Sequence, residues 1–146
     1  MVSPFAEDHT ILKTICGHSD WEVHSASTCQ EALAFVGKTP VPVVFCEKDL
    51  PDSDWKDLFD KVSRLAAAPL LIVASRFADG RLWSEVLNLG GHDVLLKPFD
   101  GKEVTWSLGL AWEHWKQERE PARGVAGTSS PMLASARARR LLPDRV

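Results

Sequence analysis

Five side chains suited to phosphoryl or metal chemistry each follow a short apolar segment of the sequence. They are Glu7, Asp8, Glu47, Ser75 and Lys97. Carboxylates can act as nucleophiles and hold Mg²⁺, whereas a lysine supplies a fixed cation for a phosphate oxygen. If the apolar segments are parallel strands of one sheet, all five groups meet at its carboxyl edge, where open α/β sheets bind ligands. The chemistry therefore depends on the elements that position these residues.

Short apolar runs alternate with helix-like periodicities between residues 1 and 118. The run 43–46, Val-Val-Phe-Cys, is apolar on both faces, which is typical of a central parallel strand. Further strands are expected at 2–6, 21–26, 70–74 and 94–96, and a helix is expected after each of the five strands. This alternation predicts an α/β fold: a doubly wound, flavodoxin-like, five-stranded parallel sheet in a three-layer sandwich.

Charge divides the chain into an acidic body and a basic end. Residues 1–116 carry 11 Lys/Arg and 17 Asp/Glu, a net charge of −6, whereas residues 117–146 carry 6 Arg and 3 acids, a net charge of +3. An acidic body argues against a nucleic-acid-binding face on the main domain. We therefore expect a domain at 1–118, followed at 119–146 by a linker and a basic tail that could form a short helix at 131–142.

The cysteines and the N-terminus indicate the compartment. Cys16, Cys29 and Cys46 are odd in number and lack metal-ligand spacing, so we expect buried, reduced thiols. The N-terminus has no basic region followed by an apolar run, and no stretch approaches the ~20 apolar residues that span a bilayer. These features predict a cytoplasmic protein that does not contact a membrane.

Two segments around the chemical residues resemble the receiver domain of two-component response regulators. Glu47-Lys-Asp-Leu-Pro51 resembles the family's Asp-x-x-x-Pro turn after the third strand. Gly90 to Phe99, which reads Gly-Gly-His-Asp-Val-Leu-Leu-Lys-Pro-Phe, resembles its Gly-Ala-x-x-x-x-x-Lys-Pro-Phe segment. The 22-residue interval from Ser75 to Lys97 also fits, and the resemblance implies a cis Lys97–Pro98 bond, an allowed state before proline.

The resemblance covers residues 1–116 and implies a role for each of the five residues. Glu47 is the phosphoacceptor equivalent, Ser75 the switch hydroxyl and Lys97 the phosphate-binding cation. A divalent metal, Mg²⁺, would be held by the remaining acidic pair, Glu7 and Asp8, together with Glu47.

Three departures from the family pattern surround the acceptor. Glu47 replaces the nucleophilic Asp, and its extra methylene moves the carboxylate by about 1.5 Å, a displacement of the size that can cost ~100-fold in rate. Trp55 stands where the family has a small Gly, so its indole could crowd or cover the pocket. Val94 takes the position of the switch aromatic, so we expect the coupling between hydroxyl and aromatic to be lost.

Each site residue also has a purely structural explanation. Glu7 and Asp8 suit a helix N-terminus, where the macrodipole favours acids. Ser75 could be a plain strand-end serine, because placing the switch hydroxyl there rather than at Ala74 requires one extra residue. Glu47 and Lys97 could simply be solvent-exposed charged residues. The same explanation applies to the acidic residues of the following loop and helix start, for which a separate metal site is an open alternative: Asp49, Asp52, Asp54 and Asp57.

Two functions from different classes follow from the resemblance. The first is a degenerate receiver, not an enzyme, that signals by protein–protein contacts without phosphorylation and requires no cofactor, although Mg²⁺ could bind. The alternative is a Mg²⁺-dependent phosphoacceptor and autophosphatase that uses Glu47 or Asp49. A flavodoxin-like binder of small molecules is less well supported, because no Gly-rich phosphate loop follows the first strand.

The resemblance also implies where partners bind. A protein partner or a second copy would use the face of the last two helices and strands, whereas a cognate histidine kinase stays an open question. In the tail, Gly127-Thr-Ser-Ser-Pro-Met132 resembles the segment that opens the ATPase domain of sigma-factor-dependent activators. The chain could therefore be a piece of a larger transcriptional regulator or a small protein of its own.

Overall fold

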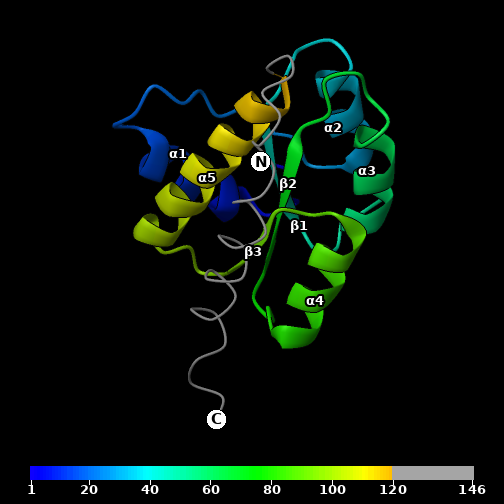
Figure 1. Ribbon diagram of the computed structural model, residues 1–146. Coiled ribbons are helices and arrows are strands. Elements are labelled where there is room, and N and C mark those ends of the chain that lie inside the picture. Colours follow the sequence, from blue (N-terminus) through cyan, green and yellow to red (C-terminus); the bar gives the residue numbers. More distant parts are fainter. Residues whose placement is uncertain (120–146) are drawn as a thin grey trace.

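The computed structural model describes residues 1–119, and a parallel sheet forms the middle of the molecule (Figure 1). Its three strands lie in the order β1-β2-β3. They are β1 (Val43–Glu47), β2 (Leu70–Ser75) and β3 (Asp93–Leu96). These strands coincide with the predicted apolar runs, because residues that are apolar on both sides are stable only where helices cover both faces of a sheet.

Five helices enclose the sheet in two layers (Figure 1). They are α1 (Ala6–Cys16), α2 (Cys29–Val36), α3 (Trp55–Val62), α4 (Gly80–Leu89) and α5 (Gly101–Arg119). One core cluster joins α1 and α5 to one face of the sheet, and a second joins α2, α3 and α4 to the other. The doubly wound, three-layer α/β architecture predicted from the sequence is therefore confirmed.

The two remaining predicted strands are reduced to single paired residues. Val2 forms parallel bridges with Cys46 on one side and with Ala26 on the other. Pairing stops after Ser3, because Pro4 has no N–H to donate and α1 begins at Ala6. The spatial order is still that of a flavodoxin-like sheet, with the Ala26 segment outermost and Val2 next to β1. The regular ladder thus has three strands rather than the expected five.

Acidic residues position the loops at the carboxyl edge of the sheet. Asp52, in the loop after β1, accepts hydrogen bonds from the backbone N–H groups of Cys29 (2.9 Å) and Gln30 (3.0 Å) at the start of α2. These bonds hold the pKa of Asp52 below its usual range. Asp54 caps α3 by accepting from the N–H of Asp57. The acidic loop is therefore a set of helix caps, which stabilise helix N-termini.

Several simpler predictions can also be compared with the structure. Cys16, Cys29 and Cys46 are free and buried, as expected. Trp106 lies off the apolar stripe of α5 and is 46% exposed. Within residues 1–119, no helix is both long and apolar enough to cross a bilayer. The predicted linker, basic tail and helix at 131–142 lie outside the described residues.

Candidate functional site

The carboxyl edge of the sheet brings together four buried polar residues from four different segments. Ser3 follows the paired residue Val2, and Asp8 lies in the first turn of α1. Glu47 is the last residue of β1, and Lys97 directly follows β3. None of the four is more than 8% exposed, so the site has little contact with bulk water.

Lys97 is the centre of this cluster, because its ammonium contacts two carboxylates. Its Nζ donates a hydrogen bond to Asp8 Oδ2 at 2.8 Å and forms an ion pair with Glu47 Oε2. The hydroxyl of Ser3 donates to the same Asp8 oxygen at 2.6 Å, which fixes the carboxylate. The ring of Phe5 covers the ammonium at 4.8 Å from its centroid, a distance at which cation–π attraction operates.

The charges of the cluster do not balance. Two carboxylates face a single ammonium, so the pocket has an excess of negative charge when both acids are ionised. Burial raises the pKa of Glu47 above its ordinary value, while the hydrogen bond and charge of Lys97 oppose that shift and Asp8 adds to it. Desolvation is the dominant cause, because a carboxylate loses more hydration in a closed pocket than one shared cation restores.

This raised pKa predicts a pH dependence that Glu47→Gln should remove. A carboxyl group with a raised native pKa binds its proton more tightly in the folded state, so the stabilisation is complete below the ordinary value of 4.5 and disappears as the pH rises through the native pKa. The difference in unfolding free energy between the parent and Glu47→Gln should therefore shift in favour of the parent as the pH falls from neutral toward 4.5. Urea unfolding at several pH values measures it, and a shift toward the variant would contradict the assignment.

Glu7 does not belong to this site, which corrects the predicted acidic pair. Its side chain is 81% exposed, with its carboxylate 4.0 Å from the guanidinium of Arg76. Glu7 and Asp8 both lie in the first turn of α1 rather than after a strand. Consecutive helical residues point about 100° apart, so only Asp8 faces inward.

Two of the three predicted magnesium ligands, Asp8 and Glu47, lie together, whereas Glu7 lies apart from them. The carboxylates of Asp8 and Glu47 both contact the ammonium of Lys97. In residues 1–119 no three or more His, Cys, Asp or Glu side chains are grouped so that they could hold a metal ion. Among the acidic residues considered for a separate metal site, Asp52 and Asp54 cap helices instead, and Asp57 accepts hydrogen bonds from Ser53 and Lys61.

Ser75 lies at the end of β2, as predicted, but its hydroxyl is already engaged. The oxygen accepts a hydrogen bond from the N–H of Phe77 at 3.1 Å, which shapes the loop before α4. The backbone C=O of Ser75 accepts from the N–H of Lys97 at 2.9 Å, so the two residues are neighbours through the main chain. The Lys97–Pro98 bond is cis, in agreement with the resemblance.

Trp55 and Val94, predicted to modify the pocket, are both core residues of the α2–α4 face. Trp55 is 1% exposed and is the largest of the fully buried side chains. Val94 is fully buried in the same cluster and pairs with Val73 of β2. Trp55 therefore contributes to the stability of the domain, and an effect of its indole on the pocket stays a prediction.

Ser3 is the site residue that the sequence alone did not reveal. The predicted first strand extends to residue 6, so the site is expected after this strand and Ser3 is expected inside it. Ser3 directly follows the residue that pairs with β1, and Pro4 marks the end of that pairing. A stricter use of proline as a strand terminator would have identified it.

Comparisons with known proteins agree with the fold. The family model described as the response regulator receiver domain matches residues 6–108. Among curated proteins, no sequence matches the chain. The chain does resemble solved receiver structures from several organisms, which are similar to it in fold.

Three of these structures illustrate the similarity. The signal receiver domain of an HD domain-containing protein from Pseudomonas fluorescens Pf-5 has a TM-score of 0.75 and 24% identity, covering 83% of this chain and 90% of that one. A CheY-like receiver domain protein from Methanospirillum hungatei JF-1 has a TM-score of 0.71 and 20% identity, covering 80% and 94%. A two-component response regulator from Clostridium difficile has a TM-score of 0.69 and 18% identity, covering 83% and 95%. With the family model matching most of the chain, the protein belongs to the response-regulator receiver domains, the signalling modules of two-component systems.

Proposed function

We propose that this chain is a degenerate receiver that signals through protein contacts without being phosphorylated. One observation carries this proposal: the Lys97 ammonium is shared between the buried carboxylates of Asp8 and Glu47. In phosphoryl chemistry this cation would be needed for a phosphate oxygen. In this domain the Lys97 ammonium is already ion-paired with Asp8 and Glu47.

Phosphorylation of Glu47 would have to disrupt the cluster. A phosphoryl group would add a charge of about −1.5 to −2 to a pocket that already holds two carboxylates for one ammonium. It would also have to displace Lys97 from Glu47 inside a site with little contact with bulk water. The hydrogen bond from the N–H of Phe77 to the Ser75 oxygen would restrain movement of this hydroxyl toward a phosphate. The ion-paired state is therefore favoured, with Glu47 taking part of the role of a phosphoryl anion.

The same cluster supports signalling without a metal cofactor. Lys97 supplies a positive charge between the two carboxylates, and it is covalently part of the domain. Glu7, the third predicted ligand, points to solvent. We therefore propose that Mg²⁺ is not required.

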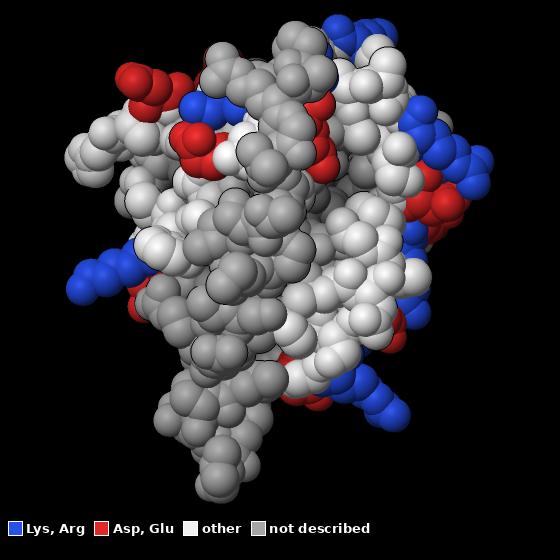
Figure 2. Space-filling model, in the orientation of Figure 1, with Lys and Arg blue, Asp and Glu red and all other residues white. Residues whose placement is uncertain are grey.

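The face formed by α4, β3 and α5 suits a protein partner or a second copy. Leu96 of β3 is 45% exposed, and Trp106 of α5 is exposed to a similar degree. Leu89, at the end of α4, is also exposed. Figure 2 shows an area without charged side chains over α4, with Lys, Arg, Asp and Glu interspersed around it. Exposed apolar side chains such as these are typical of protein interfaces, whereas a nucleic-acid face would show clustered Lys and Arg.

A phosphodonor experiment tests the proposal. The protein is incubated with acetyl phosphate and Mg²⁺, and its intact mass is measured, with an ordinary Asp-containing receiver as the positive control. We expect the control to gain a phosphoryl group and the parent to remain unmodified, because the parent's lysine is already paired.

The Glu47→Asp variant tells which part of the site prevents the reaction. We expect this variant also to remain unmodified. In the variant, Lys97 keeps its bond to Asp8, and the Ser3 hydroxyl still donates to the same Asp8 carboxylate. Stable phosphorylation of the parent at Glu47 or Asp49 would reject the proposal in favour of a phosphorylation-competent receiver. Modification of the variant alone would show that the longer side chain is the sole obstacle.

A further inference from the structure

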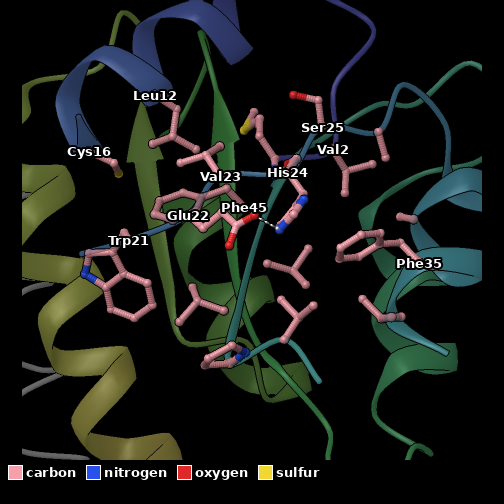
Figure 3. A pocket seen from close by; sticks show the side chains of 18 of the residues that line it. Val2, Leu12, Cys16, Trp21, Glu22, Val23, His24, Ser25, Phe35 and Phe45 are labelled. Atoms are coloured by element: carbon pink, nitrogen blue, oxygen red, sulfur yellow. Dashed lines mark hydrogen bonds and ion pairs between the residues drawn. The ribbon is translucent and has the colours of Figure 1, made fainter. Parts of the chain in front are cut away.

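The buried ion cluster continues one layer of the apolar core. Leu12, Phe45 and Leu95 belong to the core cluster on the α1–α5 face, and Figure 3 shows Leu12 and Phe45 among the side chains that line an apolar pocket. Residues four apart on a helix, or two apart along a strand, share one face. The next residues on these three faces are the charged ones: Asp8, Glu47 and Lys97. The packed core therefore anchors the three charged groups and limits their movement relative to one another.

The cluster places an amine, a carboxyl group and a second carboxylate in mutual contact. Nζ of Lys97 touches Oε2 of Glu47, and the two side chains are only 5% and 10% exposed. The same nitrogen donates to Asp8 Oδ2 at 2.8 Å, and the Ser3 hydroxyl holds that oxygen from another direction at 2.6 Å. The ring of Phe5 lies over the nitrogen. A nucleophile, an acyl carbon and a proton acceptor are the three groups that amide formation requires.

Burial changes the energetics of joining the amine to the carboxyl group. In water this condensation is unfavourable, because two well-hydrated ions are lost. Here folding has already removed most of that hydration, and attraction within a buried ion pair does not always repay its desolvation. A neutral amide carries no such penalty. Holding the reactants in contact also acts like a high local concentration, which reaches about 10⁵–10⁸ M for well-oriented groups.

From these observations we propose that Lys97 and Glu47 join through an amide bond between their side chains. A bond forms between Nζ of Lys97 and Cδ of Glu47, while the bond from Cδ to one carboxyl oxygen breaks. Of the three protons on the ammonium, one stays on the amide nitrogen and two leave with that oxygen as water. The ion pair is the reactant, and the reaction consumes no oxidant, cofactor or other molecule.

Asp8 is the catalytic residue of this reaction. The nitrogen becomes a nucleophile only after it loses a proton, and Asp8 Oδ2 lies at hydrogen-bonding distance to accept it. The proton then passes to the departing oxygen. Ser3 is a positioning residue, because its hydroxyl fixes the Asp8 carboxylate. In the product, the amide N–H still donates to Asp8, so the remaining buried carboxylate keeps two donors.

The bond would make the unphosphorylated state permanent. It consumes the carboxyl group that a phosphoryl group would need and ties the end of β1 to the residue after β3. The inference rests on the ion pair that also carries the proposed function, but it requires a covalent step that the proposed function does not. The two can therefore fail separately.

The intact mass of the complete chain tests the proposal. We expect the mass of the folded protein, measured at purification and over the following days, to fall below the sequence mass by one water molecule. Protease digestion should then yield a branched peptide in which Lys97 is attached to Glu47. Lys56 and Glu85 form the same type of pair at 2.8 Å, but their side chains are 50% and 40% exposed. This pair is the internal control and should stay unlinked.

Two variants test the roles of the residues, with circular dichroism to confirm that each is folded. Lys97→Arg keeps the positive charge, but a guanidinium does not lose its proton in proteins, so the variant should keep its full sequence mass. Asp8→Asn leaves Lys97 paired with Glu47 but cannot carry the proton. We expect it to lose water about 100-fold more slowly than the parent, which is the size of a general acid–base effect.

Three results would overturn the inference. They are a folded parent that keeps its sequence mass, a loss of water that persists in Lys97→Arg, and equal rates of water loss in the parent and Asp8→Asn. None of them adds a phosphoryl group, so the proposed function would stand. Phosphorylation of Glu47 in a parent of full sequence mass would reject both.

Discussion

Replacing Lys97 with methionine is expected to lower the free energy of unfolding by about 3–5 kcal/mol at pH 7, the range found when one partner of a buried ion pair is removed. Asp8 and Glu47 would then share a closed pocket without their cation. Ser3 would still donate to Asp8, but a single neutral hydroxyl does not replace the ammonium. Urea unfolding monitored by circular dichroism measures the loss.

Two comparisons separate this effect from a general loss of packing. Combining Lys97→Met with Glu47→Gln should recover part of the stability, because one of the two buried negative charges is removed. Lys56→Met breaks the solvent-exposed pair between Lys56 and Glu85 and should change stability little. If Lys97→Met were as mild as Lys56→Met, or if the double variant were as unstable as the single one, the buried cluster would not have the charges assigned to it.

Truncating Trp55 to alanine should cost about 3–5 kcal/mol, the range typical of large-to-small changes in a core. The indole is almost completely buried in the core cluster between the sheet and α2–α4. Thermal and urea unfolding measure the effect, and Trp55→Phe should cost less, because most of the cavity is then filled.

Trp106→Ala is the matched control, since that indole lies largely on the surface of α5. We expect its effect on stability to be a small fraction of that of Trp55→Ala. If Trp55→Ala were neutral for stability but allowed a phosphodonor to modify Glu47, the indole would be a cover of the pocket rather than a core residue.

The sequence was sufficient to predict the part of the fold in which local pattern and tertiary packing agree. The apolar run at Val43–Cys46 must be covered on both faces, so its place in the middle of the sheet follows from composition. Thr28 caps α2 by accepting from the N–H of Glu31, as the Thr-x-x-Glu pattern predicts. The meeting of Glu47 and Lys97 also followed, because parallel strands end at one edge, whereas Asp8 reaches the same edge from the first turn of α1.

The rest depended on contacts that no local pattern reports. Residues 21–26 have the composition of a strand, but a strand exists only where a neighbour pairs with it, and only Met1 to Ser3 lie alongside. Whether Glu7 or Asp8 faced the pocket depended on the residue at which α1 begins. A shift of one residue rotates a helix position by about 100°, which is enough to exchange an inward carboxylate for an exposed one.

The two hydrogen bonds from Asp52 to the start of α2 give the domain a mechanical link between distant parts of the chain. The loop that carries Asp52 follows Glu47 directly, so we expect a displacement of the Glu47 backbone to shift the first turn of α2 through these two bonds. That helix in turn packs against α3. A change in the ion cluster would therefore alter the start of α2, where the exposed residues Gln30 and Glu31 are accessible to another molecule.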